Sequence, residues 1–155
     1  NLIFRTLPNK NPDFKKRPDP ANTVALGEYL SPGCKVCHSP MDGGDFVEGK
    51  LFSGGTEFSG SKGGTIRSGN ISPDKETGIG NLTKEQFIQK FRFYGKPETQ
   101  NIPVKDGEFN TIMPWTFLAT ASDEDLGAVY DYLMTQKPVS NRVEKFTPGP
   151  IIPKR

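Results

Sequence analysis

The sequence predicts a mainly α-helical domain in which a few short helices are joined by long loops rich in glycine and proline. Three observations support this class. Only three segments have the apolar spacing of an amphipathic helix, and each is short. The 155 residues include 17 Gly and 14 Pro, which break up longer helices. The hydrophobic fraction of 33% lies below the roughly 45–50% of average soluble domains, so a thick aliphatic core is not expected.

The composition also excludes two other classes of chain. With 11 Phe, 4 Tyr and 1 Trp, the chain has too many aromatic residues for a disordered protein. No segment approaches the roughly 18 consecutive apolar residues of a membrane span. We therefore expect either a marginal, loop-rich domain or a domain whose core is completed by a group that is not an amino acid.

The net charge of +2 is unevenly distributed. Residues 1–20 and residues 141–155 each carry a net charge of +3, whereas residues 21–140 carry −4. A nucleic-acid-binding domain would show a basic stripe with interleaved aromatic residues, and the acidic middle has none, so no nucleic-acid partner is expected. The basic ends are either solvated tails or contacts for a partner.

The charge and proline distributions predict three parts. Residues 1–21 form an extended arm or linker, because the first 20 residues contain four prolines and no helical period. Residues 22–140 form the domain, and residues 141–155 form a C-terminal tail. The arm lacks the apolar region and cleavage site of a signal peptide. We expect that a leader was removed or that the chain was cut from a longer protein.

The first predicted helix begins after Asn22 or Thr23, either of which can cap it. Its apolar residues at helical spacing are Leu26, Tyr29 and Leu30. The pair Pro32-Gly33 is expected to interrupt it.

Two further helices have stronger start signals. The Thr83–Gln86 capping box predicts a helix from about 84 to 94 that stops at Gly95. Ser122 and three following acids open the last helix, which ends before Pro138. One face of this last helix is apolar, at Leu126, Val129, Tyr130 and Leu133.

Long loops separate these helices. Residues 39–72 contain nine glycines, with short strand pairs expected around Lys50–Phe58 and Gly64–Ser68. Residues 95–114 form a second loop. Structureless loops of this length are uncommon in a compact domain unless they wrap around something.

Both cysteines and the only histidine lie within five residues, as Cys34-Lys35-Val36-Cys37-His38. This C-x-x-C-H pattern is the attachment signature of c-type haem. Two thiols on one turn can add to the two vinyl groups of a haem, forming thioethers. The following histidine then lies beneath the iron as its proximal ligand.

Three other interpretations of this motif stay open. A thioredoxin-like redox pair would follow a strand in a βαβ unit, whereas here a short helix and Pro-Gly precede it. A zinc site needs about four ligands, and the chain has no second Cys pair and no second His. A structural disulfide between residues three apart would close almost no loop.

The sixth position of a haem iron favours Met113 among three methionines. Met41 is too close to His38 to reach the opposite face, and core packing is the expected role of Met134 on the last helix. Met113 lies in a loop before Pro114, which restricts the neighbouring backbone. Its alternative role is a hydrophobic anchor for the loop.

Four segments together resemble class I c-type cytochromes. These are VALGEYLSPGCKVCHSP, NISPDKETGIGNLTKEQF, MPW and SDEDLGAVYDYL. More narrowly, the chain is similar to the haem domains of cytochrome c subunits of bacterial alcohol and aldehyde dehydrogenases, over about residues 24–140. The resemblance implies a class I cytochrome c fold, with a few short helices around one covalent haem c and its iron.

The resemblance also implies residue roles. The expected cofactor-binding residues are Cys34, Cys37, His38, Met113, Asn70 and Trp115, of which His38 and Met113 bind the iron. Gly27 would lie at the crossing of the first and last helices, against Tyr132, with Val129 and Leu133 facing the haem. Residues 70–80 would cover one haem edge, and a carbonyl such as that of Pro40 would accept the other imidazole N–H. The polar segment Lys96–Asn110 is longer than the family usually has, and Ile112 stands where the family has a small residue.

The function implied is one-electron transfer between redox partner proteins, a dehydrogenase or a reductase, in the periplasm or elsewhere outside the bacterial cytoplasm. No catalytic residue is expected, because both axial positions are filled and the only His is used. Membrane association is expected only through a partner or a segment outside this chain. Two alternatives remain: a haem domain of a larger oxidoreductase, and a haem sensor or peroxidase with an open sixth position.

Overall fold

The structure, a computed structural model, describes residues 15–149. The first 14 residues of the predicted arm and the last six of the predicted tail lie outside this range. The helices are α1 (Thr23–Leu30), α2 (Pro32–His38), α3 (Lys84–Gly95), α4 (Pro97–Gln100), α5 (Trp115–Leu118) and α6 (Asp123–Met134). The strands are β1 (Met41–Asp42), β2 (Asp45–Phe46), β3 (Glu57–Ser59), β4 (Thr65–Arg67) and β5 (Phe146–Thr147). The described part is thus helical with a little sheet, as predicted, and no helix within it is long and apolar enough to cross a membrane.

The three predicted helices are confirmed, each with its cap. Asn22 caps α1, and its side-chain oxygen accepts a hydrogen bond from the Ala25 N–H. Thr83 and Gln86 form the reciprocal capping box of α3. Ser122 caps α6. Pro32 both ends the first helix and begins the next, since proline is well suited to the first position of a helix.

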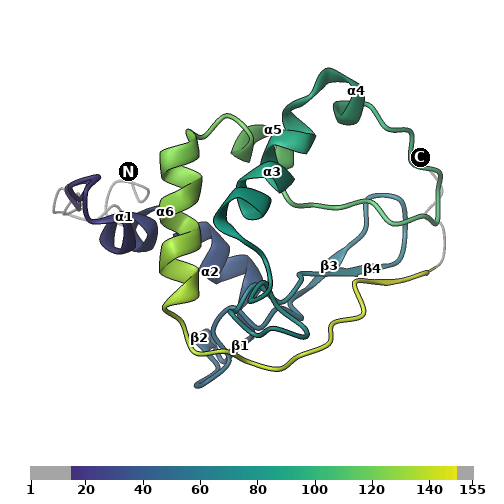
Figure 1. The fold of residues 1–155 in the computed structure, drawn as a ribbon. Helices are drawn as coiled ribbons and strands as arrows, with labels where there is room; N and C mark the ends of the chain where they lie inside the picture. Colours follow the sequence, from purple (N-terminus) through teal and green to yellow (C-terminus); the bar gives the residue numbers. More distant parts are fainter. Residues whose placement is uncertain (1–14, 150–155) are drawn as a thin grey trace, which may run out of the picture.

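Helices α1 and α6 cross closely in Figure 1 because Gly27 has no side chain. A Cβ built on Gly27 would lie 2.6 Å from the Tyr132 Cβ and would overlap the Ala128 carbonyl. Gly27 is buried, and so is Ala128 on the facing helix. The expected contact between Gly27 and Tyr132 is confirmed.

The core joins α3, α6 and two buried loop residues. Its buried members are Phe52, Ile79, Phe87, Phe91, Leu126, Val129 and Leu133. Aromatic rings fill much of this core. The ring centroids of Phe87 and Phe91 are 5.1 Å apart, and the Trp115 ring of α5 packs on Phe91 with centroids 5.3 Å apart. Large rings therefore supply much of the apolar material that the aliphatic residues lack.

The loop regions contain elements that the sequence did not reveal. β1 and β2 form a small antiparallel hairpin directly after α2, α4 is a single turn within the segment 95–114 expected to be loop, and α5 is a single turn directly after it. The strand pair expected in the glycine-rich region is present as β3 and β4, paired from Glu57–Arg67 to Ser59–Thr65. These elements are only two to four residues long, too short for a readable period.

The segment after α6 returns along the β side of the domain (Figure 1). β5 pairs antiparallel with β4, so residues 146–147 form the third strand of a sheet with order β3-β4-β5. The Arg67 guanidinium links all three strands, because it donates hydrogen bonds from β4 to the Glu57 carboxylate of β3 and the Thr147 hydroxyl of β5. At the other end, residues 15–21 contain no helix or strand, and Arg17 pairs with Asp125 of α6.

Candidate functional site

Helix α2 carries the two cysteines and the histidine. Cys34 is half-buried against the core, and Cys37, one turn later, is exposed. Neither is in a disulfide. Burial raises the pKa of the Cys34 thiol above its usual value. The helix thus presents two free thiols on successive turns, one toward the core and one toward solvent.

His38, the last residue of α2, is held through its ring. Its Nδ1 lies 2.7 Å from the carbonyl oxygen of Gly69, and because a carbonyl only accepts, Nδ1 carries the proton. Burial lowers the pKa of His38 below its usual value, the Gly69 hydrogen bond opposes this, and the charge of Lys145 adds to it. The ring is therefore favoured in its neutral form, with Nε2 as the nitrogen that can bind a metal.

The prediction that the Pro40 carbonyl accepts the hydrogen bond of the His38 ring is wrong. Ser39 adopts an extended conformation that ends the helix, and the Pro40 carbonyl accepts a hydrogen bond from the Val47 N–H instead. The hairpin after α2 uses that carbonyl. The ring partner comes from Gly69, 31 residues later in the chain.

A second backbone segment holds His38 from its main chain. The Gly54 N–H donates to the His38 carbonyl at 2.8 Å. Gly54 has a φ of 72° and packs so tightly on Gly69 that a Cβ on Gly54 would lie 2.5 Å from the Gly69 carbonyl oxygen. The two glycines therefore let the two segments that bond His38 touch each other.

Asn70, an expected cofactor-binding residue, is buried and its amide bonds to the protein. Its Nδ2 donates to the Val139 carbonyl at 2.7 Å and to the Thr77 hydroxyl at 2.9 Å. Its Oδ1 accepts from the Ser72 N–H. In the structure Asn70 ties together the loop that follows Gly69 and the chain after α6.

Met113 and Trp115, the other expected residues, lie at the start of α5. Met113 is half-buried against the core, and its carbonyl accepts from the Trp115 N–H at 2.8 Å. The Trp115 ring stacks on Tyr94 with centroids 4.6 Å apart. Ile112, just before the methionine, is 45% exposed. Packing on α3 thus positions this segment.

Comparison of the chain with known proteins shows the family to which it belongs. The chain is 35% identical over 129 residues to the fructose dehydrogenase cytochrome subunit of Gluconobacter japonicus, covering 79% of this chain and 24% of that protein. It is 38% identical over 113 residues to the gluconate 2-dehydrogenase cytochrome c subunit of Pantoea cypripedii, covering 72% and 22%. The chain is homologous to the cytochrome c subunits of bacterial dehydrogenases. The resemblance seen in the sequence is confirmed.

A third relative of this cytochrome is the cytochrome c subunit of the quinone-dependent alcohol dehydrogenase of Gluconobacter oxydans, 35% identical over 113 residues. The chain spans less than a quarter of the length of these three relatives. No protein-family model matches it.

The residues of this cytochrome fit a covalent haem. Cys34 and Met113 come from segments about 80 residues apart, yet both border the same apolar core, which also contains Val129 and Leu133. His38 has one ring nitrogen committed and one left for iron. Within residues 15–149 no three His, Cys, Asp or Glu side chains converge. A haem iron needs only two protein ligands.

Sequence reasoning missed the residues that hold His38. Gly69 and Gly54 contribute backbone groups, and a backbone group leaves no side-chain signal in a sequence. Asn141, whose Nδ2 donates to the Ser53 carbonyl, lies in the segment expected to be a tail. The only sequence signal at Gly54, Gly69 and Asn141 is the residue type, since glycine and asparagine are common in turns and at close backbone approaches.

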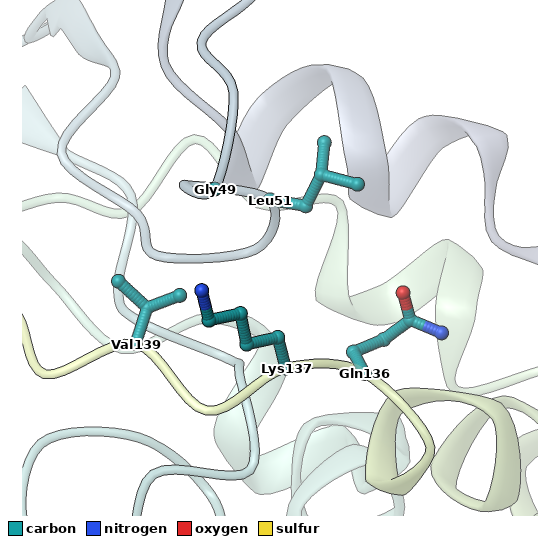
Figure 2. Close-up of a pocket in the computed structure, with 5 residues that line it drawn as sticks. All are labelled: Gly49, Leu51, Gln136, Lys137 and Val139. Atoms are coloured by element: carbon teal, nitrogen blue, oxygen red, sulfur yellow. The ribbon is translucent and has the colours of Figure 1, made fainter.

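A small pocket lies where the chain after α6 meets the loop before Phe52. Figure 2 shows its lining: Gly49 and Leu51 on one wall, and Gln136, Lys137 and Val139 on the other. None of the expected haem residues lines it.

Proposed function

We propose that this chain is a monohaem cytochrome c domain that transfers single electrons as part of a larger oxidoreductase. The observation that carries the proposal is the C-x-x-C-H helix, in which His38 already has its Nδ1–H on a backbone carbonyl. A haem-binding histidine needs this arrangement, because it fixes the ring and leaves Nε2 for iron. Homology to cytochrome c subunits supports the same conclusion.

The proposed architecture is the class I cytochrome fold, formed by residues 22–140, with residues 141–147 returning onto it through β5 and Arg17 pairing with Asp125 of α6. The close crossing of α1 and α6 at Gly27 supports it, as does the position of the C-x-x-C-H helix directly after α1. In this arrangement Val129 and Leu133, buried on α6, pack against the haem.

Each site residue has a proposed role. Cys34 and Cys37 would hold the haem through thioethers, and His38 and Met113 would be the two iron ligands. Trp115 stabilises the Met113 segment through its stacking on Tyr94. Asn70 acts on the haem environment through the backbone that it anchors. The haem supplies a reversible one-electron couple when bound.

The proposed work of the protein residues is binding and tuning. A neutral His38 and a thioether ligand favour ferrous iron more than two histidines would. With His38 and Met113 both bound to the iron, no coordination position would be left for a substrate, so the domain would pass electrons on without catalysing a reaction itself. Its partners would be a dehydrogenase or reductase, and its place the periplasm or another compartment outside the cytoplasm, where thioether haem is attached.

The test is the optical spectrum of the chain produced with an export signal in a bacterium that attaches haem. We expect one haem per chain that stays bound in denaturant, and a ferric far-red band from iron–sulfur coordination. A high-spin ferric spectrum without that band would instead support the sensor or peroxidase alternative. Absence of any covalent haem would refute the proposal.

A further inference from the structure

Residues 139–147, which we call the C-terminal strap, cross the two backbone segments that hold His38. The strap begins at Val139, whose carbonyl accepts from the Asn70 amide at 2.7 Å. It continues to Asn141, whose N–H donates to the Thr77 hydroxyl at 2.9 Å. It ends in β5, paired with β4. Residues 141–147 of the strap belong to the basic segment 141–155, to which the sequence alone assigns no role.

The strap bonds to both segments that touch His38. The Asn141 amide Nδ2 donates to the Ser53 carbonyl at 3.0 Å, and the next residue, Gly54, donates its N–H to the His38 carbonyl. Asn70 follows Gly69, the acceptor of the His38 ring. Asn141 and Asn70 therefore each act one residue away from an atom that holds the histidine.

The attachment continues beyond these two side chains. Arg67 lies two residues before Gly69, and its N–H donates to the Lys145 carbonyl at 2.8 Å. Ser72 and Val139 are bonded in both directions, at 3.1 and 3.2 Å. Because the strap is anchored on both sides of Gly69, this carbonyl has little freedom to move relative to α2.

We propose that the C-terminal strap is a positioning element for the haem ligand: through Asn141 and Asn70 it holds the Gly69 carbonyl against the His38 ring. The inference rests on the proposed haem function and extends it. A carbonyl held on Nδ1–H makes the imidazole a stronger electron donor to iron, which stabilises the ferric state. Loosening the strap weakens that donation and favours the ferrous state.

The main test compares Asn141→Ala with a matched asparagine, Asn110→Ala. Asn110, between α4 and α5, also donates through Nδ2, but to the Ser61 hydroxyl in the turn between β3 and β4 and not to a residue next to Gly54 or Gly69. Neither substitution changes a charge, so an altered potential would reflect position. In Asn141→Ala we expect the ratio of ferrous to ferric haem at a fixed solution potential to rise about threefold or more. In Asn110→Ala it should not change.

A second readout follows the hydrogen bond directly. In the ferrous protein, the His38 Nδ1 proton should exchange with solvent faster in Asn141→Ala than in the parent chain or Asn110→Ala, as measured by NMR. If Asn141→Ala does not fold, Asn141→Ser, which keeps a shorter polar side chain, should show the same changes to a smaller extent.

The outcomes separate the inference from the proposed function. A lower melting temperature of Asn141→Ala, with unchanged potential and proton exchange, would make the strap merely structural and overturn the inference. A parent chain without covalent haem would overturn the proposed function instead.

Discussion

The segments around His38 and Met113 are held in different ways. His38 makes hydrogen bonds to residues 16 and 31 positions later in the chain, one from its ring and one to its carbonyl. Within residues 15–149, the backbone hydrogen bonds of Met113 reach only Thr111 and Trp115, two residues away on either side. The position of His38 is therefore determined by distant backbone, and that of Met113 by a local turn and by packing on α3.

The difference predicts unequal tolerance to change. A ligand residue held by several long-range hydrogen bonds is not released when one neighbour is altered, because the other bonds remain, although the strength of the altered bond changes. A ligand held by packing depends on a few side chains, and the α5 turn contains only four residues. We therefore expect the His38 side to be rigid and the Met113 side to be the one that opens.

The largest effect should come from removing both attachment points, Cys34→Ser with Cys37→Ser. Without covalent haem the His38 and Met113 segments lose the group on which both would pack. A chain with 33% hydrophobic residues then lacks a sufficient core. We expect loss of most helical circular dichroism and of the bound haem in denaturing gels. A compact form that melts cooperatively without haem would contradict this.

The second-largest effect should come from Gly27→Ala, which disturbs the crossing of α1 and α6. The added Cβ overlaps the Ala128 carbonyl, and overpacking of this kind costs about 3 kcal/mol. The measurement is the free energy of unfolding in denaturant. Gly33→Ala is the matched control, because a Cβ there meets no atom within 4 Å, so it should lose no stability.

Met113→Ala should affect one side alone. We expect loss of the ferric far-red band and binding of added imidazole at the iron, while covalent haem and the His38 ring proton remain. Met134→Ala and Met41→Ala are the matched controls and should keep the band, since Met134 lies at the end of α6 and Met41 is 49% exposed. An unchanged spectrum in Met113→Ala would refute the ligand assignment.

The smallest effect concerns acid stability on the His38 side. Hydrogen bonds from the Thr77 hydroxyl and N–H hold the pKa of Asp74 below its usual value. The stability this adds is fully present above the ordinary pKa of about 3.9 and is lost as the pH falls through the lower folded value. Melting temperatures from pH 6 to pH 2 should fall less steeply below pH 4 in Asp74→Asn. Equal slopes would show that Asp74 contributes nothing.

Much of this protein could be predicted from local sequence. The helices α1, α3 and α6 were predicted because Asn22, Thr83 and Ser122 are side-chain caps placed before helical apolar spacing. The haem motif was readable because its residues are contiguous. Gly27 against Tyr132 was expected through the family resemblance and is present.

Other features depend on residues distant in sequence. The ring of His38 takes the Gly69 carbonyl and not that of Pro40, whose carbonyl accepts the Val47 N–H next to the β1–β2 hairpin. No rule on local sequence chooses between two carbonyls, since every residue has one. The role of Asn141 likewise appears only once the chain after α6 lies on Ser53.

The sequence by itself determined the helices, the attachment motif and the candidate iron ligands, because caps, periodicity and contiguous motifs act over a few residues. The tertiary structure decided which backbone carbonyl orients His38, how Gly54 and Gly69 pack together, and that residues 141–149 lie on the folded domain. These are contacts between backbone groups far apart in the chain, and only the folded arrangement brings such groups within hydrogen-bond distance.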